Sequence, residues 1–164
     1  MSFNLTAQFL DEKRHEVQRQ SHFKIQIKGL TDELTLHTRS TNLPSVSFET
    51  LTTRYGNEEN KQAGSRSFND LALNVHDAVG LDMQRQLHAW QQEVQNTKTG
   101  VMGYASDYKR TAIITEYTIN GEVRNQWEFR GVWPSSLSFG DLNRDGTEKK
   151  TLNMTLSYDK AWLK

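Results

Sequence analysis

The sequence predicts a mainly β protein in which two antiparallel sheets pack as a sandwich or small barrel, with one flanking α-helix. Three observations support this fold class. Apolar and polar residues alternate with a period of two in several short segments, which is the pattern of half-buried strands. The dipeptide Asn120-Gly121 separates two of these segments and is a strong hairpin signal. Only one segment carries apolar residues at helical spacing, so nothing indicates the strand–helix alternation of a parallel sheet.

The chain is expected to form one domain over residues 1–164, because it contains no internal repeat, linker or low-complexity tract. Residues 1–21 are predicted to form an N-terminal arm. The arm is polar and mixed in charge, and its thin apolar stripe fits one or two helical turns and a frayed terminus equally well.

The first strand is predicted around Phe23, Ile25 and Ile27, which alternate with polar residues. Residues 29–32 then turn the chain, and Leu34 and Leu36 are expected to begin a return strand, giving an early hairpin.

Leu43-Pro44 is expected to interrupt strand pairing, since proline has no backbone donor for the ladder. The alternation resumes at Val46 and Phe48. Residues 55–65 show no apolar period and are predicted to be an exposed loop bounded by Gly56 and Gly64. Loops of this length often carry a function, and contact with another subunit is a natural one.

The next strand is expected to begin at Phe68 and to alternate through Leu71, Leu73 and Val75. A surface helix follows. Its candidate N-cap is Asp77 and its plausible stop is Gly100. Its packed face is predicted from four residues at helical spacing: Met83, Leu87, Trp90 and Val94.

The central hairpin is predicted from Ile113 to Phe129. Asn120-Gly121 would form a type I′ turn, in which both central residues need a positive φ. Trp133-Pro134 is expected to end the return strand.

The last strand is predicted to bury one face and to expose a smooth polar one. The buried face would hold Leu152, Met154, Leu156 and Tyr158, and the small uncharged face would hold Thr151, Asn153, Thr155 and Ser157. Such a polar face suits the wall of a water-filled channel, but it suits the outside of a sandwich as well.

Composition limits the function classes. The hydrophobic fraction is only 35% and the mean hydropathy is −0.77, which fits a protomer stabilised by its neighbours and also a very soluble monomer. Lys plus Arg and Asp plus Glu each number 20. A dedicated nucleic-acid binder normally shows a basic excess, whereas a net charge near zero permits self-association.

The chain has no cysteine, which excludes disulfides, thiolate metal sites and cysteine catalysis and fits a reducing compartment. No apolar run has membrane-spanning length, and residues 1–6 lack the basic and apolar regions of a secretory signal. We therefore expect assembly in a cytoplasm.

A search for chemistry gives no catalytic, cofactor-binding or metal residue. Asp141-x-Asn143-x-Asp145-Gly146 resembles the first half of a calcium loop, but Leu152 stands where a bidentate Glu is required. We favour an Asx-rich turn in which Gly146 supplies an unusual backbone angle. The five histidines lack metal-site spacing, and no nucleophile elbow or phosphate-cradling loop occurs.

Aromatic residues of the return strand leave one alternative open. Trp127, Phe129 and Trp133 could stack single-stranded nucleic acid, with Arg124 and Arg130 among the basic residues nearby. We favour the core for Trp127 and Phe129, because they share a face with Val123, which is the expected core face.

Short motifs follow one another in a distinctive order along the chain. They are Leu43-Pro44, Arg66-x-Phe68-x-Asp70, Trp90 late in the helix, Asp107-Tyr108-Lys109, Gly131-x-Trp133-Pro134 and Asp159-x-x-Trp162. In this order, from about Phe23 to Trp162, the sequence resembles the tail-tube proteins of T4-like contractile bacteriophages.

The resemblance implies the tail-tube fold and a structural protein of the virion with no catalytic site and no cofactor. Six protomers would form a ring with a continuous inner barrel, and rings would stack into a hollow tube that DNA traverses during ejection. The implied partners are further copies of the chain, the tail sheath protein, the baseplate and tail-terminator proteins, and the tape-measure protein and DNA in the lumen, bound without sequence specificity. No membrane anchor is implied.

Two sets of site residues follow as expectations from the resemblance. The predicted contacts between subunits are Tyr55, Asn57, Glu58, Glu59, Asn60 and Lys61, and the predicted lumen-facing residues are Thr151, Asn153, Thr155 and Ser157. A tube of a bacterial contractile injection system of the type VI kind remains an alternative, as does, with less support, a β-barrel nucleic-acid-binding module.

Overall fold

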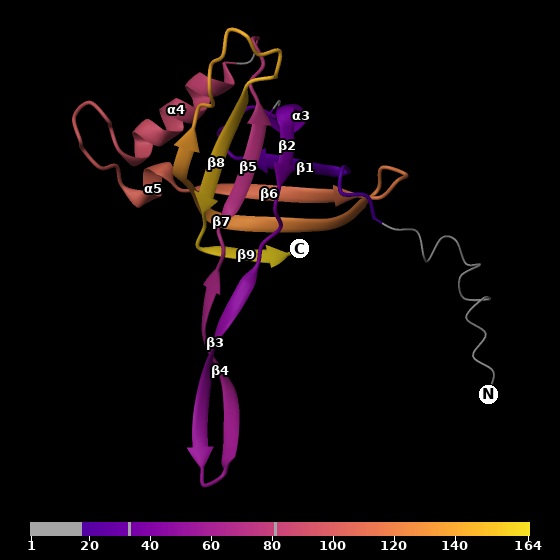
Figure 1. The fold of residues 1–164 in the computed structure, drawn as a ribbon, viewed down its shortest axis with the longest axis vertical. Coiled ribbons are helices and arrows are strands. Elements are labelled where there is room, and N and C mark those ends of the chain that lie inside the picture. The colour runs from indigo at the N-terminus through magenta and orange to yellow at the C-terminus, as the bar shows by residue number, and fades with distance from the viewer. Residues whose placement is uncertain (1–17, 33, 81) are drawn as a thin grey trace, which may run out of the picture.

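A computed structural model describes residues 18–32, 34–80 and 82–164, which form nine strands and three helices (Figure 1). The strands are β1 (Phe23–Ile27), β2 (Thr38–Thr41), β3 (Val46–Tyr55), β4 (Glu58–Phe68), β5 (Leu71–His76), β6 (Arg110–Tyr117), β7 (Val123–Ser138), β8 (Thr151–Ser157) and β9 (Lys160–Leu163). The helices are α3 (Leu34–His37), α4 (Met83–Val94) and α5 (Ala105–Tyr108).

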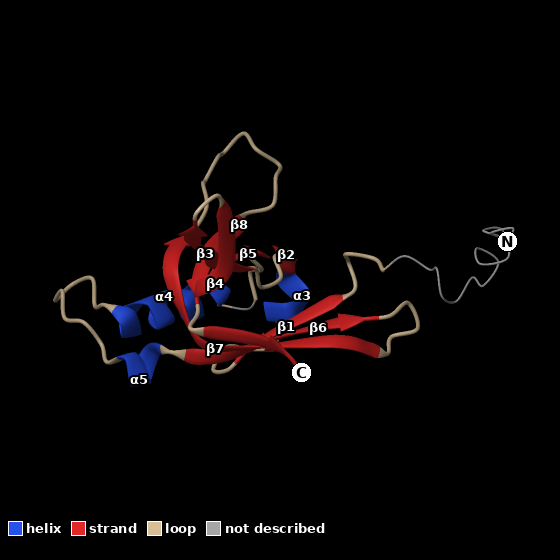
Figure 2. Cartoon of the chain, turned by 90° about the horizontal axis from the view of Figure 1, so that it is seen from below, coloured by secondary structure: helices blue, strands red, loops and turns tan. Residues whose placement is uncertain are grey.

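The body consists of two antiparallel layers that share one long strand. In the first layer, β1 pairs with β6, β6 with the first half of β7, and that half with β9. In the second layer, the other half of β7 pairs with β8, β8 with β5, and β5 with β2. The first layer forms a base, with α3, α4 and the second layer on one side of it (Figure 2).

Strand β7 changes layer at Gly131, which has a φ of 68°. A side chain at this position would collide with the carboxylate of Asp159. Since only glycine adopts such a φ without strain, the sequence supports a bend here.

The core lies between the layers. Cross-strand neighbours such as Leu73 and Met154 face each other in it, and α4 covers one side with Met83, Leu87 and Trp90. Phe129 is fully buried and Trp127 packs against the core, so the expectation that these two aromatics belong to the core is confirmed.

Three predictions between Phe23 and Leu71 are wrong. β1 pairs with β6 and not with a neighbouring return strand, and Leu34–His37 forms the short helix α3. Residues 55–65 are not a loop: β3 and β4 form a long hairpin that turns at Gly56, and Phe68 ends β4 while the next strand begins at Leu71. Every residue of β3 is exposed, so the hairpin has no buried face to produce an apolar period.

Helix α4 is shorter than expected. It begins after Asp82 and not after Asp77, and it ends at Val94, before Gly100.

Three details of the second half also differ from expectation. Trp133-Pro134 does not end a strand, because β7 continues into the second layer as an edge strand, where proline is tolerated. Val123 is 61% exposed and lies outside the core. The short strand β9 has no counterpart in the prediction.

The predicted turns occur at the predicted positions, but their backbone angles differ from those expected. At Asn120-Gly121, only Gly121 has a positive φ, and its N–H bonds the carbonyl of Thr118, so the turn is not type I′. In the loop at 139–150, Gly140 and not Gly146 has the positive φ. The turn there is Asx-like, since Asn143 Oδ1 accepts from the N–H of Asp145 at 3.0 Å.

Most of the predicted N-terminal arm, residues 1–17, lies outside the described residues. Its described end joins the body, because Gln18 Nε2 donates to the carbonyl oxygen of Tyr117 at 2.7 Å.

Candidate functional site: assembly surfaces

The four polar residues predicted on the last strand share one face of β8. Thr151, Thr155 and Ser157 are half-buried and Asn153 is exposed, while the residues between them are buried. The predicted two-faced strand is therefore confirmed.

The polar face extends beyond β8 onto residues of the neighbouring strands, which the sequence pattern alone does not place there. Residues directly opposite in an antiparallel ladder lie on the same face. Thr155 lies opposite Ser136 and Ala72, and Asn153 lies opposite Ser138 and Asn74. Asn74 Nδ2 in turn donates to Ser40 Oγ at 2.7 Å, which reaches β2.

We call this surface of the second layer the neutral face. It consists of Ser40, Ala72, Asn74, Ser136, Ser138, Thr151, Asn153, Thr155 and Ser157, and it is bordered by His76 opposite Thr151 and by Trp133 opposite Ser157. Between these two borders, the pairing of four strands places small, uncharged side chains on one surface. The strand pairing could not be read from the sequence, so only the β8 residues were found.

The six residues predicted to contact other subunits lie at the tip of the β3–β4 hairpin, and all are exposed. Arg54 and Glu59 form an ion pair of 2.8 Å there. Leu51, which is apolar, is 54% exposed. Tyr55, which is amphipathic, is 73% exposed. The hairpin projects away from the body, and no other element of the described residues covers it (Figure 1).

The base of the hairpin is fixed to the body. Asn69 N–H donates to the carbonyl oxygen of Ser45 at 3.0 Å, and Asn42 Nδ2 donates to the carbonyl oxygen of Asp70 at 3.1 Å. The ring of Phe68 lies 5.5 Å from that of Tyr158. The anchored base and the uncovered tip indicate an arm whose direction is set by the body.

Tyr158 is buried beneath this base. Its hydroxyl is among the described groups without a hydrogen bond. Burial raises the pKa of Tyr158 above its usual 10.0; the backbone of Ser45 offsets part of the rise, and the carboxylate of Asp70 adds to it.

The second layer has two free edges. In the described chain, β2 pairs only with β5, and the second half of β7 pairs only with β8. Unpaired edges present rows of backbone donors and acceptors, which native proteins cover or pair.

Three of the sequence motifs meet at one corner of the body. Lys109 Nζ lies 2.8 Å from each carboxylate oxygen of Asp159, whose own N–H donates to the carbonyl of Arg130 at 3.0 Å, beside Gly131. The ring of Tyr108 lies 6.0 Å from that of Trp133 in an edge-to-face arrangement.

The late tryptophan of α4 joins this corner. Trp90 Nε1 donates to the carbonyl oxygen of Tyr108 at 2.8 Å, and the guanidinium of Arg110 lies 4.8 Å from the Trp90 ring. Arg110 also pairs with Glu93 at 2.9 Å. These contacts join α4, α5, β6 and β7, so the motifs hold the architecture together.

Within the described residues, no group of three His, Asp or Glu side chains could hold a metal ion. The described helices include none that is long and apolar enough to cross a membrane.

Comparison with known proteins gives a consistent result. A sequence model of the family described as T4-like virus tail tube protein gp19 matches residues 19–161. The tail tube protein gp19 of Enterobacteria phage T4 is 27% identical over 146 residues, which cover 86% of this chain and 88% of the phage protein.

Solved structures show the same fold. A chain of the sheath–tube complex of an extracellular contractile injection system, PVC, in its extended state has a TM-score of 0.73 at 16% identity and matches over 97% of both chains. A chain of the tube-terminating cap of the anti-feeding prophage has a TM-score of 0.71 at 19% identity, over 90% of this chain and 91% of that one.

These comparisons confirm the resemblance carried by the ordered motifs and the tail-tube fold that it implied. The chain belongs to the family of T4-like virus tail tube proteins, which are structural components of the virion tail and not enzymes.

Proposed function

We propose that this protein is the protomer of the inner tube of a contractile phage tail, and that six copies close into a ring whose stacked repeats enclose the DNA channel. The observation that carries the proposal is the second layer, which combines two free strand edges with the neutral face. A sheet of this kind continues from copy to copy and presents one uniform surface.

Ring closure follows from the free edges. When the β7 edge of one copy pairs with the β2 edge of the next, the contact is head-to-tail, and a head-to-tail contact that closes by rotation gives a ring. The closed ring leaves no open edge in the second layer, which removes the risk of uncontrolled edge pairing.

The neutral face lines the lumen in this arrangement, including the predicted residues Thr151, Asn153, Thr155 and Ser157. DNA binds proteins largely through basic side chains that neutralise phosphates. A wall of small uncharged side chains offers no such contact, so DNA slides past without being held.

The hairpin connects one ring to the next through the six predicted contact residues at its tip. A ten-residue strand such as β3 is about 33 Å long at ~3.3 Å per residue, enough to reach a neighbouring copy. Docking there covers Leu51 and Tyr55. Deletion of residues 57–63 is expected to stop tube growth while the body, which holds the core, still folds; normal tubes from the deleted chain would refute this role.

The proposed partners outside the tube are the sheath, the baseplate and the tail terminator, with the tape-measure protein and DNA inside it. Two related chains support the outer contacts, since one comes from a sheath–tube complex and one from a tube-terminating cap. A tube of a bacterial injection device is the second candidate, favoured by the likeness to the PVC chain. Capsid and terminase genes beside the coding sequence would decide for a phage.

Negative-stain electron microscopy of the purified protein over a concentration series tests the proposal. Hollow tubes or rings of uniform width are the expected result. If the protein stays monomeric, it is next added to purified baseplates, where tube growth is expected. A chain that remains monomeric in both conditions would overturn the proposal.

A further inference from the structure

An apolar segment projects from one flank of the body. We call residues 96–104, which follow α4, the apolar loop. Val101, Met102 and Tyr104 in this loop are 65%, 62% and 81% exposed. Three large side chains that extend into solvent from one short segment indicate a surface that another protein covers.

The apolar loop is held in one shape by its own hydrogen bonds. Asn96 N–H donates to the carbonyl oxygen of Val101, and Gly103 N–H donates to the carbonyl oxygen of Val94, each at 3.0 Å. Asn96 Oδ1 also accepts from the N–H of Lys98 at 3.0 Å and from that of Thr99 at 3.2 Å.

The close return of the loop onto α4 explains Gly103. A side chain at this position would collide with the carbonyl oxygen of Glu93. The apolar side chains are therefore presented on a preorganised segment, which lowers the entropic cost of binding.

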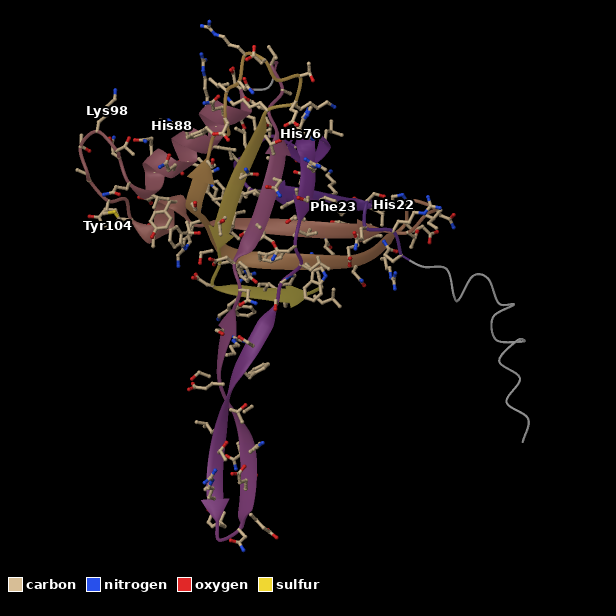
Figure 3. All side chains as sticks on the ribbon, viewed as in Figure 1. His22, Phe23, His76, His88, Lys98 and Tyr104 are labelled. Carbon is tan, nitrogen blue, oxygen red and sulfur yellow. The ribbon has the colours of Figure 1, made fainter. Side chains whose placement is uncertain are left out.

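A groove of about 510 Å³ lies on the opposite flank, between the first layer and β2. Its apolar lining includes Phe23, Leu43 and Ile114, and Leu43 is 42% exposed. Figure 3 shows the two flanks: Lys98 and Tyr104 mark the side of the apolar loop, and His22 and Phe23 mark the side of the groove.

We propose that the apolar loop of one protomer docks into this groove of the next protomer in the same ring. The free edge of β7 lies on the flank of the loop, and the free edge of β2 lies on the flank of the groove (Figure 1). Head-to-tail pairing of these edges therefore brings the loop of one copy toward the groove of its neighbour.

The charges on the two surfaces allow this contact. The apolar loop carries one charge, that of Lys98, and the groove is lined by Glu116 and Arg39. The groove thus has one charge of each sign and presents no single-sign field that would repel the loop of a second copy. The inference rests on the proposed ring and adds the side chains that lock it.

Cross-linking of assembled rings or tubes tests the contact. The natural chain has no cysteine, so Met102→Cys with Leu43→Cys introduces the only two thiols. A short bifunctional maleimide is expected to produce a ladder of covalent oligomers beyond the dimer, as a head-to-tail contact requires. The single variants are expected to give no ladder. Met102→Cys combined with Leu142→Cys is a further control and is also expected to give no ladder. Leu142 is 87% exposed and lies in the 139–150 loop.

The outcomes separate this inference from the proposed function. Rings or tubes visible by electron microscopy without a ladder, or with covalent dimers alone, would overturn the docking and leave the tube assignment intact. A ladder that appears only after residues 2–17 are deleted would also overturn it, because the chain's own N-terminal segment would then occupy the groove. Failure of the natural chain to form rings or tubes, both alone and on purified baseplates, would overturn both.

A second variant measures the energy of the contact. Tyr104→Ser removes a large exposed side chain that contributes nothing to the core, so the fold is expected to be retained. Loss of one buried aromatic anchor is expected to raise the concentration needed for ring formation about tenfold. Leu142→Ser is the matched control. Equal assembly of the two variants would contradict the proposal.

Discussion

At the scale of single residues, the motifs that identify the family form contacts that join elements distant in sequence. Lys109 and Asp159 are 50 positions apart in sequence and form a bidentate ion pair, and Gly131 leaves the space that Asp159 occupies. Both charged side chains are partly exposed, so the pair is worth at most about 1 kcal/mol. Its main effect is positional, since it ties the C-terminal strand to the bend in β7.

Gly131→Ala tests this contact. The left-handed φ alone costs a non-glycine residue about 1–2 kcal/mol, and the new methyl group must also displace Asp159 from Lys109. Gly121→Ala is the control, because Gly121 has a φ of 81° and open space around it. Urea denaturation is expected to show a larger loss for Gly131→Ala. Equal losses of stability would mean that the close approach of Gly131 to Asp159 does not contribute to the free energy of unfolding.

Tyr158 gives a prediction about pH. Its pKa is raised by burial, so the folded state holds the phenolic proton more tightly than the unfolded state. This contribution to stability is complete below pH 10.0, the ordinary pKa, and is lost as the pH rises through the folded-state pKa. Tyr158→Phe removes the titration, so its free energy of unfolding is expected to fall less steeply above pH 10 than that of the natural chain.

Stability measurements between pH 8 and pH 11 check this expectation. Tyr55→Phe serves as the control, because Tyr55 is 73% exposed at the hairpin tip. At neutral pH, Tyr158→Phe is expected to change stability by at most about 1 kcal/mol, since the hydroxyl makes no hydrogen bond of normal geometry and loses only its interaction with the backbone of Ser45. Parallel pH profiles for Tyr158→Phe and the natural chain would contradict the argument.

At the scale of elements, prediction from sequence succeeded where one face of an element is buried. β8 shows this, with Leu152, Met154 and Leu156 buried between exposed or half-buried polar residues. It failed where an element has no buried face, as in the β3–β4 hairpin, and where pairing joins distant segments, as between β1 and β6. Because the pairing of distant strands could not be predicted, only the β8 part of the neutral face was found from the sequence.

The hairpin itself is expected to gain its stability from assembly. A two-stranded ribbon without a packed face is marginal in water. In the unassembled protein, backbone amides of β3 and β4 should therefore exchange with deuterium much faster than those of β5 and β8, and assembly into tubes should slow their exchange. Hydrogen-exchange mass spectrometry of both states measures this. Equal protection of the hairpin and the core strands before assembly would show that the hairpin is stable alone.

At the scale of the whole molecule, function follows from which surfaces remain unsatisfied in a single copy. The core buries the inner faces of both layers, whereas in the described part of the chain the two edges of the second layer, the hairpin and the apolar loop stay uncovered. The low hydrophobic fraction, 35%, could not distinguish a protomer from a soluble monomer. The positions of these uncovered surfaces favour the protomer, because they lie on opposite flanks and at one end.

The lumen assignment gives the prediction that depends on the complete assembly. Asn153→Lys places one positive charge per copy on the neutral face, and in a ring these charges surround the channel. We expect the tube to assemble, because Asn153 is exposed, and DNA ejection to slow markedly at low ionic strength and to recover as salt screens the phosphate contacts. Asn153→Gln keeps the face neutral and should eject DNA normally. If both variants eject DNA at the natural rate at low salt, the neutral face lies outside the channel, and the second layer does not form its wall.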